Sequence, residues 1–195
     1  MPQTDELQLL DRIAARDHQA FEQLYHLYYQ RLTRFLYRFT RRAESIEEIV
    51  NDTMFVVWQN AAAFRRKSRV STWIFGIAYR TALKELRRRG RSPEQESQSE
   101  MLIEGMGAPD PAVDRWELQR SLEAALATLS AEQRAVVELT YFHGYSCQEV
   151  ADIVGCPVNT VKTRMFYARK RLRDKLPRLE AAHSSRLRRG PGEPS

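Results

Sequence analysis

The sequence predicts an all-α protein with two small helical domains joined by a flexible acidic linker. Apolar residues recur at three- and four-residue steps in both halves of the chain, which is the period of an amphipathic helix. Helix-capping sequences precede several of these stretches. No segment shows the sustained alternation of apolar and polar residues that is typical of a strand. The length of 195 residues leaves room for one large domain or two small ones.

The composition excludes several classes of protein. No apolar run approaches the roughly 20 residues that a membrane-spanning helix needs. Residues 1–10 carry two acids and no base, unlike a signal peptide. Two cysteines, Cys147 and Cys156, cannot form a disulfide framework, which fits a reducing cytoplasm. The four histidines are scattered, so we predict no metal site, no cofactor and no catalytic residue, and we do not expect an enzyme.

The positive charge is concentrated in two blocks. The formal net charge is +6, which suggests a polyanionic partner without identifying it. Residues 61–91 hold ten Lys and Arg and one acid, and residues 161–176 hold seven and one. Between them, residues 92–114 hold six acids and no base. This arrangement predicts two separate basic surfaces.

The acidic stretch predicts the domain boundaries. Residues 92–114 contain three prolines and two glycines, and their low apolar content with one sign of charge predicts a flexible linker. We therefore expect a first domain over 1–91, a second domain over 115–178, and a disordered basic tail over 179–195.

Three helices are predicted before the linker. Asp17 can cap the first, and Ser45–Glu48 reads as a capping box that opens the second. Ser71 can cap a third helix that runs to Arg89. The apolar positions expected to face the core are Phe21, Leu24, Tyr28, Leu32, Phe35, Leu36, Phe39, Ile49, Val50, Thr53, Val57, Ile74, Ile77 and Ala78.

After the linker, the spacing of Val113, Trp116, Leu122 and Leu126 predicts a helix, and Ser130 begins a second capping box.

A helix-turn-helix is predicted next. A capping box at Ser146 opens a short helix over 147–154, and Gly155 stands where a helix end favours positive φ. A longer basic helix follows, from about Asn159 to Leu176. A short helix, a glycine-bearing turn and a basic second helix form the layout of this DNA-binding motif.

The second helix of the motif is expected to read duplex DNA. Its N-terminal residues reach base edges in such motifs, and later bases hold phosphates. Arg164 is the first candidate for a guanine reader because its guanidinium matches O6 and N7. The alternative is a solvated basic helix in a bundle. The capping box, the glycine turn and the basic second helix are three independent signals at the correct spacing, and together they favour DNA binding.

For the two cysteines, packing is favoured over a zinc site because no other ligands lie nearby.

The first basic block mixes bases with aromatics and hydroxyls, which suits single-stranded nucleic acid. The loop over 63–72 has the groups to hold an extruded base. The alternative is that Trp73 belongs to the core and that Arg87–Arg91 form a loose phosphate clamp. For Trp73 itself, the core position is favoured.

On the helix before this block, Glu47, Glu48 and Asp52 lie in sequence near Phe55 and Trp58. They form either a protein-binding surface or a solvent face over core aromatics, and the residues alone leave both open.

In this order, the motifs resemble those of the extracytoplasmic-function sigma factors, the smallest members of the bacterial sigma-70 family. Glu48–Trp58 resembles the helix by which sigma region 2 binds the clamp helices of core RNA polymerase. Val70–Ala78, followed by Arg87–Arg89, resembles the promoter-melting helix that reads the −10 element. Gly144–Ala151 and Thr160–Arg164 resemble the region 4 helix-turn-helix that reads the −35 element.

The resemblance implies three sets of contact residues. The polymerase set is Glu48, Asn51, Asp52, Phe55 and Trp58. The −10 set is Phe64, Arg65, Arg66, Lys67, Ser71, Thr72, Trp73, Arg80, Lys84, Arg87 and Arg88. The −35 set, within 146–172, is Asn159, Thr160, Lys162, Thr163, Arg164, Tyr167 and Arg171. Many members carry Arg-Asn and a later acid where this chain has Tyr79, Arg80 and Lys84.

The resemblance also implies partners: core RNA polymerase, promoter DNA and an anti-sigma factor, with no small-molecule substrate. Two alternatives remain at this stage. An ordinary helix-turn-helix regulator would leave residues 64–91 without a single-strand role. A nuclease would need clustered carboxylates for metal ions, and Glu47, Glu48 and Asp52 lack further ligands in the sequence.

Overall fold

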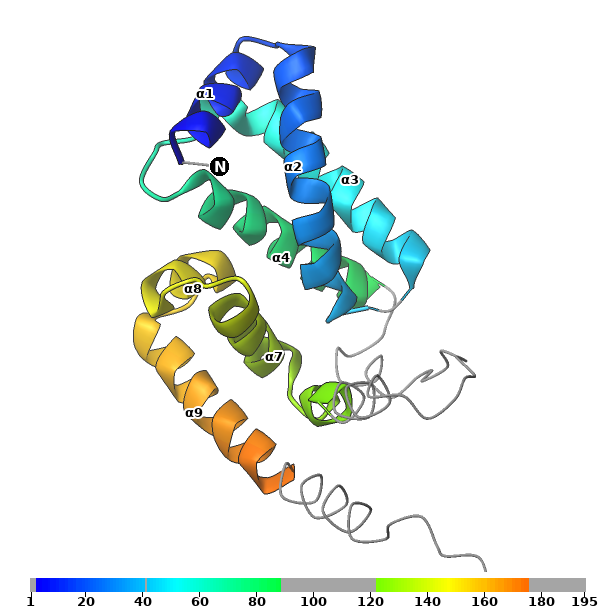
Figure 1. Ribbon diagram of the computed structural model, residues 1–195, viewed down its shortest axis with the longest axis vertical. Helices are drawn as coiled ribbons and strands as arrows, with labels where there is room; N and C mark the ends of the chain where they lie inside the picture. The colour runs from blue at the N-terminus through cyan, green and yellow to red at the C-terminus, as the bar shows by residue number, and fades with distance from the viewer. Residues whose placement is uncertain (1–2, 41, 89–121, 176–195) are drawn as a thin grey trace, which may run out of the picture.

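The computed structural model describes residues 3–40, 42–88 and 122–175, and these residues form helices joined by short connections, with no strand among them (Figure 1). The predicted all-α fold is confirmed. The predicted linker and basic tail, and the start of the helix predicted from Val113, lie outside the described residues. Within the described part of the chain, no helix is long and apolar enough to cross a membrane.

The first unit is a bundle of four helices. Its elements are α1 (Gln3–Ala14), α2 (His18–Tyr37), α3 (Ala43–Asn60), the short 3-10 helix η1 (Ala61–Ala63) and α4 (Val70–Arg88). Helix α1 was not predicted. Leu9, Leu10 and Ile13 bury its inner face, and α1 packs against α2, α3 and α4. The spacing of these three residues is the signal that could have found the helix.

One of the three predicted caps in this unit is confirmed. The carboxylate of Asp17 accepts hydrogen bonds from the backbone N–H groups of Gln19 and Ala20, at 2.9 and 3.1 Å. These bonds satisfy donors that the first turn of a helix leaves free. Hydrogen bonding to the charged form lowers the pKa of Asp17.

The caps predicted at Ser45 and Ser71 are wrong. Both helices start earlier, because the carbonyl oxygen of Arg42 already accepts from Ile46 N–H at 3.1 Å and that of Arg69 accepts from Trp73 N–H at 3.1 Å. Each serine therefore lies inside the first turn and is buried. A capping sequence marks a helix start only where no helix-forming residue precedes it.

The second unit contains residues 122–127, which are helical, and then α7 (Ala131–Val137), the π-helical turn η2 (Glu138–Phe142), α8 (Cys147–Val154) and α9 (Val158–Lys175). The capping boxes at Ser130 and Ser146 are both present, each with reciprocal bonds to the residue three positions on. The π-helical turn was not predicted.

Helices α8 and α9 form the predicted helix-turn-helix. Gly155 ends α8 in the left-handed conformation, with φ of 68°, and its N–H donates to the carbonyl oxygen of Ala151 at 2.9 Å. Val161 and Met165 face the core one helical turn apart, as expected. A residue with a side chain would strain this turn, so glycine fixes the angle at which α9 leaves α8.

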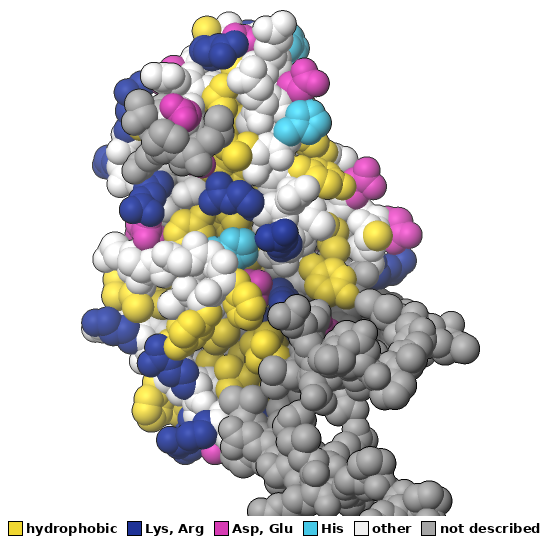
Figure 2. Space-filling model, in the orientation of Figure 1, with side chains coloured by type: hydrophobic (Ala, Val, Ile, Leu, Met, Phe, Trp, Pro, Cys, Tyr) yellow, Lys and Arg dark blue, Asp and Glu magenta, His cyan; other side chains and the backbone are white. Residues whose placement is uncertain are grey.

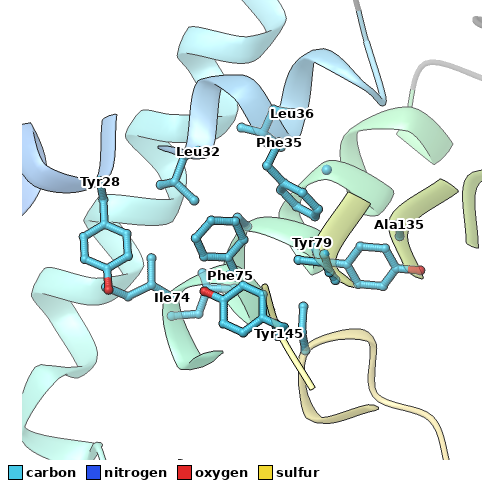
Figure 3. Packing of buried hydrophobic residues seen from close by; sticks show 14 of the residues in the cluster. Tyr28, Leu32, Phe35, Leu36, Ile74, Phe75, Tyr79, Ala135 and Tyr145 are labelled. Atoms are coloured by element: carbon cyan, nitrogen blue, oxygen red, sulfur yellow. The ribbon is translucent and has the colours of Figure 1, made fainter. Parts of the chain in front are cut away.

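The two units also pack against each other, mainly through α4 and α8. Buried apolar residues form one continuous cluster that runs from α1 through α4 into α7, α8 and α9. Figure 3 shows Phe75 of α4 near both Phe35 of α2 and Tyr145, which precedes α8. Periodicity predicted that Phe35 is buried, but it did not predict that the second unit helps to bury it.

Candidate nucleic-acid and partner interfaces

The helix-turn-helix presents a basic surface along α9. Asn159, Lys162, Thr163, Tyr167 and Arg171 are exposed, and Tyr167 keeps 53% of its surface accessible. Thr160 and Arg164 are half-buried. The structure therefore brings the predicted −35 residues together on one helix with most of them open to a partner. Figure 2 shows that Lys and Arg side chains lie over both units on the face in view.

Two arginines of this helix make contacts within the chain. Nη1 of Arg164 lies 3.6 Å from Sγ of Cys156, in the turn of the motif. Nη1 of Arg171 donates to the carbonyl oxygen of Thr128 at 3.0 Å. Each contact uses Nη1 alone, so the other N–H donors of both guanidinium groups are outside these two bonds. Cys156, like Cys147, is a half-buried free thiol that packs against the core.

The first basic block divides into a loop and a helix. The loop covers 64–69 and is shorter than the predicted 63–72, because α4 begins at Val70. Arg65, Arg66 and Lys67 are exposed on it. Arg66 has φ of 55° and pairs with Asp11 at 2.6 Å, a contact between α1 and the loop that the sequence did not indicate.

The two hydroxyl residues predicted to contact the −10 element are not on the surface. Ser71 is 7% accessible and Thr72 is 2% accessible, so neither is open to DNA in this structure. Trp73 is half-buried and lies 5.1 Å from the ring of Phe64, as the core interpretation expected. The accessible basic residues of α4 are Arg80, Lys84, Arg87 and Arg88.

The acidic surface on α3 is real and includes an exposed aromatic. Glu48, Asn51 and Asp52 are exposed, and Phe55 keeps 58% of its surface accessible. The exposed face of α3 therefore combines one apolar ring with acidic and amide groups. Nε of Arg88 bonds to Glu85, and its Nη2 lies 3.6 Å from Glu48, so α4 reaches the edge of this surface.

Trp58 belongs to an aromatic cluster at the end of α3. Its ring stacks on His18 at 4.7 Å and meets the edge of Phe21 at 5.2 Å, and the guanidinium of Arg16 lies 5.4 Å from its centre. These contacts leave Trp58 half-buried. Its first role is therefore packing, whereas Phe55 has no such cover.

Helix α2 adds two residues to this surface that the sequence analysis missed. The hydroxyl of Tyr25 donates to Oδ1 of Asn51 at 2.8 Å, and the ring of Tyr29 lies 5.8 Å from that of Tyr25. Burial raises the pKa of Tyr25, so its hydroxyl stays protonated and keeps donating. Tyr25 and Tyr29, at an interval of four residues, were the available signal.

No group of His, Cys, Asp and Glu in the described ranges could hold a metal ion. Glu47, Glu48 and Asp52 therefore acquire no further ligand from the fold within these ranges, and the metal-dependent alternative gains no support.

Comparison with known proteins identifies both units. The family model for sigma-70 region 2 matches residues 24–92, and that for sigma-70 region 4 matches residues 119–172. An extracytoplasmic-function RNA polymerase sigma factor of Cereibacter sphaeroides, RpoE, is 34% identical over 81% of this chain and 87% of its own length. The chain belongs to the extracytoplasmic-function sigma factors.

Other relatives of this sigma factor agree. SigM of Mycobacterium tuberculosis is 30% identical over 85% of this chain and 81% of its own length. The sigma-H factor of Pseudomonas aeruginosa is 26% identical over 87% of this chain and 93% of its own length.

Solved structures share the fold. RpoE of Bartonella quintana, solved with the anti-sigma factor NepR, is 28% identical with a TM-score of 0.61, over 80% of this chain and 96% of that one. CnrH, solved with the cytosolic domain of CnrY, is 24% identical with a TM-score of 0.66, over 89% of this chain and 97% of that one. The matches extend over both units of the sigma factor.

Proposed function

We propose that this sigma factor binds core RNA polymerase and directs transcription initiation at promoters whose −35 element it reads as duplex and whose −10 element it opens. The observation that carries the proposal is the separation of surfaces on the chain. An acidic surface with an exposed aromatic lies on α3, while basic surfaces lie on the loop over 64–69, on α4 and on α9. A protein partner and a nucleic acid can therefore be bound by different faces.

The polymerase contact is assigned to α3. Glu48, Asn51, Asp52 and Phe55 share its exposed face, which supports direct contact. Trp58 is assigned a supporting role, since it packs against His18 and Arg16 at the end of that face. The clamp helices of the polymerase are the expected partner, and a basic and apolar surface on them would fit these residues.

Recognition of the −35 element is assigned to α9. Asn159, Thr160, Lys162, Thr163 and Arg164 lie in its first two turns, where a recognition helix meets base edges in the major groove. Tyr167 and Arg171 lie further along, where phosphate contacts are expected. Arg164 is the proposed reader of a guanine, and it would exchange its contact with Cys156 for the base.

Opening of the −10 element is assigned to the loop over 64–69 and to α4. Arg65, Arg66 and Lys67 would neutralise phosphates of the displaced strand, together with Arg80, Lys84, Arg87 and Arg88. Phe64 and Trp73 form an aromatic pair at the base of the loop that can receive a stacked base. Ser71 and Thr72 contribute only if the start of α4 rearranges, because both are buried.

Regulation by an anti-sigma factor is part of the proposal. The structure of Bartonella RpoE with NepR supports it, since that relative is 28% identical and its match extends over both units. The proposal assigns no chemical reaction to the chain, because polymerase carries out nucleotide addition. It also places the protein in the cytoplasm, where polymerase and chromosome are found.

The first test is co-elution with purified core polymerase. The wild-type protein is expected to elute with the core enzyme, and Asp52→Lys should weaken the complex by about tenfold, because it reverses a charge in the centre of the acidic surface. Asp152→Lys is the matched control, since it reverses an exposed charge on α8, in the second unit and outside this surface. A protein that does not co-elute at all would leave the helix-turn-helix regulator as the better account.

A further inference from the structure

An ion pair joins the loop over 64–69 to α1. Nη2 of Arg66 donates to Oδ1 of Asp11, 55 residues earlier in the chain, at 2.6 Å. The loop follows η1, which packs against α1, so the two segments lie side by side (Figure 1). The match to the family model for sigma-70 region 2 begins at residue 24, so α1 lies outside it. The pair therefore connects a base of the proposed −10 surface to a helix that has no role in the proposed function so far.

The fold determines the position of both side chains. Leu10 and Ile13 are buried and anchor α1 in the core, whereas Asp11, which lies between them in sequence, is exposed. Arg66 has φ of 55°, a left-handed conformation that is unfavourable for a residue with a side chain and persists where the surroundings impose it. Asp11 is one such constraint, because its carboxylate binds the end of the Arg66 side chain.

The carboxylate of Asp11 offers Arg66 the same kind of partner as DNA does. Carboxylates and phosphates are both anions whose oxygens accept charge-assisted hydrogen bonds from a guanidinium. Arg66 is one of the residues assigned above to phosphates of the opened strand. In this structure its Nη2 donates to Asp11, and the negative charge of Asp11 opposes the approach of a phosphate to the remaining N–H groups.

We propose that Asp11 competes with DNA for Arg66 and thereby lowers the affinity of the loop over 64–69 for phosphates. The inference rests on the proposed function, since it concerns the surface to which opening of the −10 element is assigned. Its consequence is selectivity, because a strand that is bound through phosphates alone loses affinity, whereas contacts to bases are unaffected. Asp11 is a residue that determines specificity through Arg66.

The expected effect is small and has a definite sign. The side chains of Arg66 and Asp11 are 61% and 58% accessible, so water and salt weaken their attraction. Removal of the Asp11 charge should tighten the binding of a single strand by about two- to fivefold, which is the range for an exposed ion pair. A purely structural role for Asp11 predicts the opposite, because loss of a supporting contact would weaken binding.

The test measures binding of the full chain to a fluorescein-labelled single-stranded oligothymidylate by fluorescence anisotropy at low salt. Asp11→Asn should bind more tightly than wild type by the factor given above. A plot of log affinity against log salt concentration should also be steeper by up to about 0.7, because a base released from its acid becomes one more phosphate contact. Should Asp11→Asn lose helical circular dichroism, Asp11→Ala gives the same comparison, since alanine favours the helix.

Glu44→Gln is the matched control. It also removes one exposed acid from the first unit, but Glu44 lies in the first turn of α3, at the opposite end of that helix from η1 and the loop. A helix of 18 residues is about 27 Å long, so salt screens this charge from the loop. The affinity of Glu44→Gln should equal that of wild type.

Double variants test whether the effect depends on Arg66. In an Arg66→Gln background, Asp11→Asn should leave the affinity unchanged. In a Lys67→Gln background it should have its full effect, since Lys67 is another exposed base of the same loop. Unchanged or weaker binding by a folded Asp11→Asn protein, or the same gain in both backgrounds, would overturn the proposal.

Transcription in vitro separates this inference from the function on which it rests. With core polymerase and a library of genomic fragments, Asp11→Asn should start transcripts at more sites than wild type does. A wild-type protein that starts none would contradict the proposed function, and the anisotropy measurement would still decide whether Asp11 competes for Arg66. Tighter binding by Asp11→Asn with an unchanged set of start sites would contradict the effect on selectivity.

Discussion

Arg134 of α7 donates a hydrogen bond from Nη1 to the backbone carbonyl oxygen of Arg38, 96 residues earlier in the chain, at 2.7 Å. The same guanidinium donates to the carbonyl oxygens of Leu126, Ala127 and Leu129, at 3.1 to 3.2 Å. One buried arginine thus satisfies carbonyl oxygens in the last turn of the helix over 122–127 and just after it, and it ties the second unit to the end of α2.

Arg134→Met should destabilise the protein by about 3 kcal/mol, because it leaves several carbonyls without their charged donor while it keeps most of the side-chain volume. Urea unfolding followed by circular dichroism measures the change. The free energy of unfolding of Arg134→Lys should lie between those of wild type and Arg134→Met, since a single ammonium cannot reach all four carbonyl oxygens. Equal stability for Met and wild type would show that water replaces the arginine at no cost.

His143 should make the stability of the protein depend on pH. Burial and the nearby charges of Arg31 and Arg34 lower its pKa from 6.5 to about 4. The neutral imidazole is therefore favoured in the folded protein, and its contribution to the free energy of unfolding is complete above pH 6.5 and lost as the pH falls from 6.5 through 4.

The measurement is the melting temperature between pH 7.5 and pH 4.5 for wild type and His143→Gln. Wild type should lose more stability over this range than His143→Gln, because other titrating groups are common to both. Parallel curves would show that His143 is hydrated in solution. The charges of Arg31 and Arg34 and the rings of Phe35 and Phe75 come from the first unit, and the ring of Tyr145, which stacks on His143 at 6.4 Å, comes from the second. The effect should therefore report the contact between the two units.

Gly155→Ala should cost about 1 kcal/mol, because alanine is strained at φ of 68°. No atom lies within 4 Å of the added Cβ, so the cost is conformational rather than steric. Gly155→Asn is the control and should cost less, since asparagine tolerates the left-handed region. Chemical denaturation of the three proteins gives the comparison, and a larger loss for Asn than for Ala would contradict the account of this turn.

Arg164→Ala should weaken binding to a −35 duplex by roughly 1–3 kcal/mol and relax the preference at one base pair. Lys170→Ala is the matched control, since Lys170 is exposed on α9 outside the predicted contact set. If Lys170→Ala weakens binding, it should weaken binding to every duplex by the same factor. Binding titrations against duplexes with single substitutions distinguish the two effects. Uniform loss across all duplexes for Arg164→Ala would make it a phosphate contact instead.

Features that depend on neighbouring residues in the chain, such as helix caps and turns, could be predicted from the sequence. Asp17 and Ser146 cap their helices because a side-chain oxygen stands beside free N–H groups, and Gly155 ends α8 because only its backbone suits the turn. Ser71 failed as a cap because Arg69 already accepts the first helical bond. The capping pattern gives the type of element more securely than its first residue.

Long-range contacts were beyond prediction from the sequence. The periodicity of α2 predicted that Phe35 is buried, but a hydrophobic face does not specify its partner. No role was predicted for Arg134, although it bonds to a carbonyl oxygen 96 residues away. In the candidate site, charge patterning predicted the exposed bases of α9, whereas the burial of Ser71 and Thr72 depends on where α4 begins and what covers it.

The most direct test of the account is transcription in vitro with core RNA polymerase, this protein and a library of genomic fragments. The account predicts new transcripts that start at a shared pair of sequence elements, that require the protein, and that Asp52→Lys and Arg164→Ala each reduce. Transcripts that do not change when the protein is added to an active core enzyme would contradict it.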